Sequence, residues 1–155
     1  MRTAIAMTAL LALAAPAAAW QFSLEREYGM FVGELSGRSG RSLVVARCFA
    51  DDPAGRELTV SLDAGLDGPA PDGPVDVSFS SVAGSVTVPM EMSGQRRRLL
   101  LYGWGDDAAR TIGLLGRSPA GIEVSVLGAT FPFTDRDGPA AVLGFGQVCA
   151  SLPRP

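Results

Sequence analysis

The sequence contains no histidine and no lysine, so that all 13 of its basic residues are arginines. These absences exclude several classes of enzyme. A Ser-His-Asp triad and a Cys-His pair both need an imidazole, and a Ser-Lys dyad or a Schiff base needs a lysine. A zinc ion would depend on carboxylates and two cysteines, which form a poor ligand set for it. Carboxylate chemistry is the kind of catalysis that composition leaves easily open, and we expect no metal ion and no cofactor.

Long apolar runs are also missing. A membrane-spanning helix needs roughly 20 apolar residues, and the longest run, residues 3–15, is shorter. This run follows Arg2, ends at Pro16, and precedes three alanines that end at Ala19. A positive start, an apolar middle and small residues before the cleavage point are typical of a secretory signal peptide. We therefore predict cleavage between Ala19 and Trp20, export, and no membrane span.

Removing 19 of the 155 residues leaves 136, which is the length of a single domain with a real core. We predict one β-rich domain over residues 20–155. Loss of Arg2 changes the formal net charge from −3 to −4. A mildly acidic domain has no general attraction to nucleic acid or to anionic lipid, so neither is expected as a partner.

Cysteine is scarce, with only Cys48 and Cys149 in the chain. Two cysteines of an exported protein usually pair, and a single intramolecular pairing exists here. The chain-entropy treatment gives about 4.7 kcal/mol of stabilisation for a closed loop of about 100 residues. A redox pair usually stands as C-x-x-C, whereas these cysteines are distant in sequence and lie among apolar residues. We expect a structural disulfide.

Most of the mature chain alternates apolar and polar residues, the pattern of half-buried strands. The strands predicted from this pattern are residues 43–49, 57–63, 75–80, 85–90, 98–104, 122–127 and 129–133, with one or two more within 20–35. Residues 98–104 are apolar almost throughout, which favours a central strand covered on both faces. Pro132 favours an edge strand or a bulge for residues 129–133.

Two stretches change to helical spacing. Residues 106–116 start with Asp106, a plausible N-cap, and end with Gly116. The second stretch starts with Asp137 as N-cap and places Pro139 in the first turn. We therefore predict a mainly β, sandwich-like domain of about seven strands, with a short internal helix and a C-terminal helix.

The predicted C-terminal helix is marginal by itself. Gly144 and Gly146 each weaken it by about 1 kcal/mol relative to alanine. Its apolar face consists of Ala141, Val142, Phe145, Val148 and Cys149. We expect Cys149 to tie this helix to the strand that carries Cys48.

The framework resembles the small periplasmic proteins associated with type VI secretion, of the TagO or VasI kind, and related exported domains. The matching segments are "LVVARC" with Cys48, "LTV" at residues 58–60, "AARTIGLLG", and "AVLGFGQVC" with Phe133 leading it. The resemblance covers roughly the last two thirds of the chain. It implies the periplasm of a Gram-negative bacterium, and a role in contacting a secretion apparatus or peptidoglycan.

One polar cluster is a candidate for binding. In "QRRRLLLYGWG", Arg96, Arg97 and Arg98 have the fork geometry that suits a carboxylate or phosphate, and Tyr102 and Trp104 are suited to stacking against a ring. The alternative is a charged turn that leads into a buried strand, with the arginines simply solvated.

Two acidic pairs are candidates for carboxylate chemistry or calcium binding: Asp51-Asp52 and Asp106-Asp107. The alternative is that they serve turns and a helix cap.

The favoured hypothesis is a non-enzymatic binding or assembly-accessory domain that contacts another envelope protein or peptidoglycan. The runner-up is an inhibitor of a lysozyme or protease that presents the loop at residues 63–74, and the third hypothesis is a carboxylate-dependent hydrolase.

Overall fold

The computed structural model describes residues 20–27, 30–52, 55–63, 71–95, 98–134 and 136–153, with the backbone alone for residues 94, 95 and 98. Within these residues, nine strands form one antiparallel sheet in the order β1-β2-β3-β4-β7-β6-β5-β8-β9. The strands are β1 (Trp20–Glu27), β2 (Met30–Ser39), β3 (Ser42–Phe49), β4 (Glu57–Leu62), β5 (Val75–Ser81), β6 (Gly84–Gln95), β7 (Arg98–Trp104), β8 (Ile122–Val126) and β9 (Ala129–Phe133). The described helices are α1 (Gly105–Gly116) and α2 (Gly138–Ala150).

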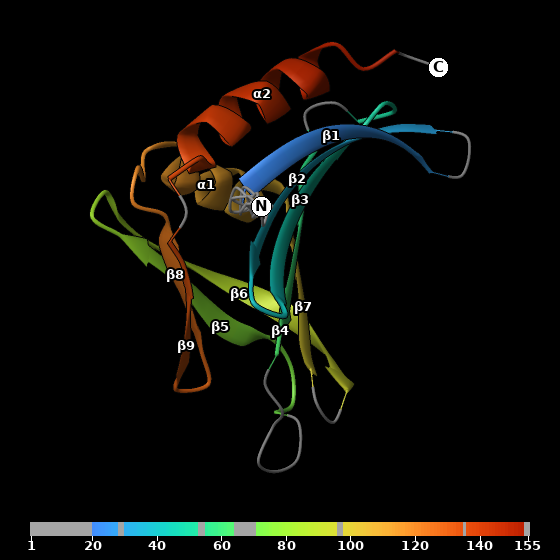
Figure 1. The fold of residues 1–155 in the computed structure, drawn as a ribbon. Coiled ribbons are helices and arrows are strands. Elements are labelled where there is room, and N and C mark those ends of the chain that lie inside the picture. Colours follow the sequence, from blue (N-terminus) through green and yellow to red (C-terminus); the bar gives the residue numbers. More distant parts are fainter. Residues whose placement is uncertain are drawn as a thin grey trace, which may run out of the picture.

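Strand β6 connects the two halves of the sheet. Its residues 84–90 pair with β5, and its residues 91–95 pair with β7. The strand therefore changes partner between Met90 and Glu91, and the sheet turns there. In Figure 1, β1, β2, β3 and β4 curve along one side of the molecule, and β5, β8 and β9 lie across from them.

The hydrophobic core fills the space between these two halves. Alternate residues of each strand point into it, as the sequence pattern predicts: Leu58, Val60 and Leu62 of β4 are at most 1% exposed. The rings of Trp20 in the first strand and Phe133 in the last have centroids 6.1 Å apart. The two ends of the sheet therefore meet across the core.

Both helices lie on this inner side of the sheet. Leu114 and Leu115 of α1 and Phe145 of α2 belong to the same buried cluster as the inner strand residues. Helix α2 runs above β1 and beside α1 (Figure 1). No helix among the described residues combines the length and the apolar character needed to cross a membrane.

Helix α1 begins earlier than predicted, and the assignment of Asp106 as its N-cap is wrong. The N-cap is Trp104, whose backbone is extended, and Asp106 lies in the first turn. Gly105 has a φ of 62°, a left-handed conformation that glycine adopts without strain. The Gly105 N–H donates to the carbonyl oxygen of Arg56 over 2.9 Å, which fixes the end of β7 against the start of β4.

Helix α2 has the predicted start, with Asp137 as N-cap and a proline in the first turn. The Ala141 N–H donates to the carbonyl oxygen of Asp137 over 2.9 Å. Gly144 has a packing role that the pattern did not indicate: a Cβ atom there would overlap the ring of Phe22 in β1. A glycine that weakens the isolated helix thus permits its close approach to the sheet.

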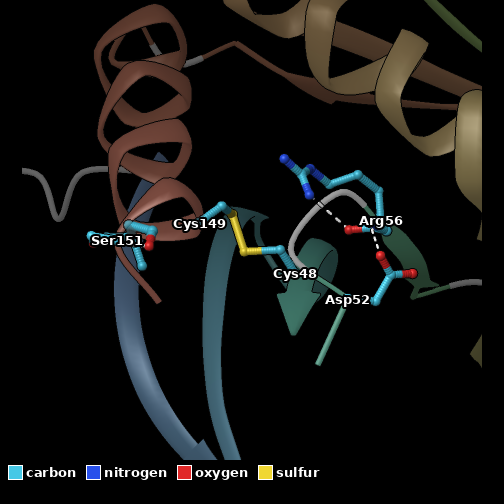
Figure 2. The surroundings of a disulfide bond; sticks show 7 residues. Cys48, Asp52, Arg56, Cys149 and Ser151 are labelled. Carbon is cyan, nitrogen blue, oxygen red and sulfur yellow. Dashed lines mark hydrogen bonds between the residues drawn. A yellow bond between two sulfur atoms is a disulfide. The ribbon is translucent and has the colours of Figure 1, made fainter. Parts of the chain in front are cut away.

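The predicted disulfide is confirmed. Cys48 of β3 and Cys149 of α2 are bonded, with Cα atoms 5.9 Å apart. Both are buried, at 0% and 2% exposure. Figure 2 shows the bond joining the helix to the strand, beside the segment that carries Asp52 and Arg56. Such burial favours a structural role over an exchanging redox pair.

The predicted mainly β fold is confirmed, with its internal helix and its disulfide-tied C-terminal helix. Residues 20–35 contribute to two strands, β1 and β2, and β6 extends five residues beyond its predicted end. The two layers of the sandwich-like arrangement belong to one bent sheet, because β6 is long enough to pair with β5 in one layer and with β7 in the other. β9, which contains Pro132, is an edge strand as expected. The predicted signal peptide lies outside the described residues, which begin at Trp20.

Candidate functional site

The candidate site lies on the outer face of the sheet, defined here as the side of β1, β2, β3, β4 and β7 that points away from the core. Strand β7 alternates: Leu99 and Leu101 point into the core, and Leu100, Tyr102 and Trp104 point outward. β7 is central in the sheet, as predicted, but its outer side is not covered. Trp104 is 54% exposed. Both helices pack on the inner side, which leaves these outward rings facing solvent.

Tyr102 and Trp104 form what we call the aromatic pair. Their ring planes are inclined by 13°, and their centroids are 6.3 Å apart. Rings in direct face-to-face contact would lie about 3.5–4.0 Å apart. The two rings are therefore nearly parallel but too far apart for direct face-to-face contact. Residues two apart on a strand share one face of the sheet, which is why the spacing Y-G-W produces this pair.

Three polar residues flank the aromatic pair. Tyr102 stands opposite Thr59 of β4 on one side and opposite Glu91 of β6 on the other. Trp104 stands opposite Glu57 of β4. Side chains directly opposite on antiparallel strands have Cβ atoms about 4.5–5.5 Å apart, so that these groups are immediate neighbours of the rings. The Thr59 hydroxyl donates to Glu57 over 3.3 Å.

Next to this group, Arg47 of β3 holds a cluster of carboxylates from three other strands. Its Nε donates to Glu34 over 3.0 Å, and its terminal nitrogens lie 3.9 Å from Glu27 and 3.8 Å from Glu57. Partial burial lowers the pKa of Arg47. The hydrogen bond to Glu34 and the charges of the three glutamates outweigh that effect, and the pKa is raised. The cluster orients Glu57 beside Trp104.

Arg56 directly precedes Glu57 in the sequence, but its side chain packs on the inner side of the sheet. Its guanidinium lies 5.7 Å from the centre of the Phe145 ring in α2, and its Nη1 donates to the Gly55 carbonyl oxygen over 2.7 Å. Burial lowers the pKa of Arg56, and the nearby Asp52 carboxylate opposes that shift. The side chain of Arg56 thus packs on α2, away from the aromatic pair.

The predicted arginine cluster is described only through the backbone of Arg98. Arg98 begins β7 and Trp104 ends it, a separation of about 20 Å along an extended strand. Arg96 and Arg97 lie outside the described residues, as does the side chain of Arg98. Of the predicted patch, Tyr102 and Trp104 are brought together, and their immediate neighbours are acidic rather than basic.

The acidic pairs have structural partners. Asp52 accepts a hydrogen bond from the Gly55 N–H over 2.9 Å, as in a turn, and Figure 2 shows this contact. Asp107 forms an ion pair with Arg110 one turn later in α1. The Asp52 contact agrees with the turn role considered above, whereas the predicted helix cap is wrong, because Asp106 and Asp107 lie in the first turn of α1 and its N-cap is Trp104. Within the described ranges, no three His, Cys, Asp or Glu side chains are grouped so as to hold a metal ion.

A shallow depression of about 380 Å³ lies in the other half of the sheet, away from the aromatic pair. It is lined mainly by Ser80, Ser81, Val82, Ile122, Glu123 and Thr134. Glu123 is the carboxylate in this lining, whereas a glycoside hydrolase needs two opposed carboxylates. Of the loop proposed for inhibition, residues 64–70 lie outside the described part of the chain.

Sequence reasoning missed Glu57, Glu91 and the cluster around Arg47. Glu57 and Arg47 lie at outward positions of predicted strands, which was a usable signal, whereas Glu91 lies beyond the predicted end of its strand. The neighbours across the strands depend on strand order and register, and neither follows from periodicity. No protein-family model, curated protein or solved structure matches this chain at a significant level.

Proposed function

We propose that this protein is an exported, non-enzymatic binding domain of the bacterial cell envelope, and that it contacts another envelope protein through the outer face around Tyr102 and Trp104. The observation that carries the proposal is the exposure of Trp104 on a sheet whose other side carries the core and both helices. Tryptophan is enriched at protein interfaces and is among the residues that carry most of their binding energy.

Three further features support export and a binding role. The signal-like start of the chain ends at Ala19, and the described fold begins at the next residue, Trp20. The buried Cys48–Cys149 disulfide is consistent with an oxidising compartment. The resemblance to periplasmic proteins associated with type VI secretion implies an accessory role in that setting, with peptidoglycan as the other expected partner.

The proposal is tested by capture of partners from periplasmic extract with the exported, oxidised protein. Trp104→Ala should reduce recovery of a specific envelope protein at least tenfold, because removal of an interface tryptophan commonly costs about 2 kcal/mol or more. Val82→Ala is the control, since Val82 is an exposed apolar residue (85%) in the turn between β5 and β6, away from the aromatic pair. Bound proteins and muropeptides are identified by mass spectrometry, and circular dichroism verifies that each variant is folded.

A second variant, with Arg96, Arg97 and Arg98 all changed to alanine, separates the two candidate patches. If recovery of the captured envelope protein depends on the arginines but not on Trp104, the binding face is at the end of β7 that begins with Arg98. Recovery of a secreted lysozyme or protease as the sole partner would replace the proposal by the inhibitor hypothesis. Equal recovery by all variants would refute a role for the outer face.

A further inference from the structure

We propose that the aromatic pair and its flanking glutamates bind a cationic segment of a partner protein, with an arginine side chain of that segment lying against Trp104. The inference rests on the proposed function, because it names the ligand class for the same face. The proposed ligand is a basic peptide rather than a glycan strand. Three properties of this face favour it: the rings, the charges and the hydrogen-bond acceptors.

The rings provide the first reason. A cation over the face of a tryptophan or tyrosine is attracted by the negative face of the π system, and tryptophan gives the strongest interaction. Trp104 and Tyr102 are nearly parallel, with centroids 6.3 Å apart, and lie on the same side of the sheet, where Trp104 is 54% exposed. The guanidinium group of arginine is planar and stacks on aromatic rings in this way.

The charges provide the second reason. Glu57 and Glu91 stand directly beside the rings, and Glu27 and Glu34 belong to the adjoining cluster. Arg47 is the cation of that cluster and already faces three of these four carboxylates. The described groups at this end of the outer face thus carry an excess of negative charge. A cationic partner is attracted to such a surface, and an anionic one is repelled.

The chemistry of the acceptors provides the third reason. The polar groups beside the rings are two carboxylates and the hydroxyl of Thr59, which already donates to Glu57. The face therefore offers negatively charged acceptors, and the described donors beside them are the Tyr102 hydroxyl and the Trp104 indole N–H. Arginine carries five N–H donors and no acceptor, which suits this set. A neutral sugar does not neutralise the charge, and the carboxylates of a muropeptide would be repelled by it.

Nuclear magnetic resonance provides a direct test, because the chain has two tryptophans and hence two indole N–H signals. Trp104 is exposed and Trp20 is buried in the core at 3% exposure, so that the Trp20 signal serves as an internal control. The Trp104 signal is assigned by its loss in Trp104→Phe. The probes are the blocked pentapeptide Gly-Arg-Gly-Arg-Gly, its lysine and glutamate counterparts, and the tetramer of N-acetylglucosamine.

We expect the arginine peptide to shift the Trp104 signal in a saturable manner at millimolar concentration, with little effect on Trp20. The lysine peptide should bind more weakly and the glutamate peptide should not bind. Raising the salt from about 0.1 M to 1 M reduces the screening length from about 10 Å to 3 Å and should weaken binding severalfold. Trp104→Ala should weaken binding about tenfold, as measured by calorimetry, which corresponds to about 1.4 kcal/mol.

Glu91→Gln and Glu123→Gln form a matched pair. Both change an exposed strand glutamate and raise the net charge by one, but Glu91 stands opposite Tyr102 and Glu123 lies on β8. Weaker binding of the arginine peptide by Glu91→Gln alone supports the proposal. An equal loss of affinity in both variants would show that the peptide responds to net charge and not to the group beside Tyr102. If the glucosamine tetramer shifts the Trp104 signal and the arginine peptide does not, the proposed ligand class is wrong, although the outer face is still a binding surface. If no probe shifts Trp104, this inference fails, and the capture experiment decides the proposed function separately.

Discussion

At the scale of single residues, several glycines stand where two elements approach closely. Gly37 in β2 lies under the ring of Trp20, and Gly144 in α2 lies against the ring of Phe22. A Cβ atom at either position would overlap an aromatic ring. Gly146, two residues further along α2, has open space in the position of its missing Cβ. Glycines of one helix therefore have opposite expected responses to substitution.

Gly144→Ala should destabilise the protein by about 1–3 kcal/mol, because the added methyl group overpacks the contact between α2 and β1. Gly146→Ala is the control in the same helix, and it should stabilise the protein by up to about 1 kcal/mol through helix propensity. Urea denaturation followed by circular dichroism measures both free energies of unfolding. Equal stabilisation by the two substitutions would contradict the close packing of α2 on β1.

At the scale of elements, α2 depends on its attachments. Its buried residues include Ala141, Phe145 and Cys149, and its opposite side, with Leu143 at 66% exposure, faces solvent. The disulfide holds its last turn to β3, and Arg56 lies over the Phe145 ring. Because this helix contains glycines and is short, tertiary contacts rather than intrinsic propensity stabilise it.

Reduction of the Cys48–Cys149 bond should therefore lower the free energy of unfolding by about 2–5 kcal/mol, the range for loss of a native disulfide in a small secreted domain. Urea titrations with and without a reducing agent measure the difference. The double variant Cys48→Ala, Cys149→Ala is the control, and its stability should not respond to the reducing agent. Identical unfolding of the oxidised and reduced protein would show that the bond does not stabilise the domain.

At the scale of the whole molecule, the two ends of the sheet meet in the core through Trp20 and Phe133. Trp20 is the first residue of β1, the first described residue, and the residue that follows the predicted cleavage point. A mature chain that begins at Trp20 keeps this ring, whereas cleavage one residue later would remove it from the core. The position of processing thus bears on the stability of the entire fold.

We expect the intact mass of the exported protein to correspond to a chain that begins at Trp20 and contains one disulfide. Trp20→Ala should lower the free energy of unfolding by about 3–5 kcal/mol, the usual cost of removing a buried tryptophan side chain. Gln21→Ala, at an exposed position of the same strand, should stay within about 0.5 kcal/mol of the wild type. A mass that includes residues 1–19 would contradict cleavage.

The sequence by itself determined the disulfide and the existence of the strands and both helices, because these depend on local periodicity and a count of two cysteines, but it did not determine the start of α1 or the end of β6. It also identified Tyr102 and Trp104 as candidates. Only the tertiary structure decided that β6 pairs with strands of both halves of one bent sheet. It alone brought Glu57 and Glu91 beside the rings. The physical reason is that strand order and register arise from pairing between distant segments, whereas alternation along a strand shows which side a residue occupies and not what lies next to it.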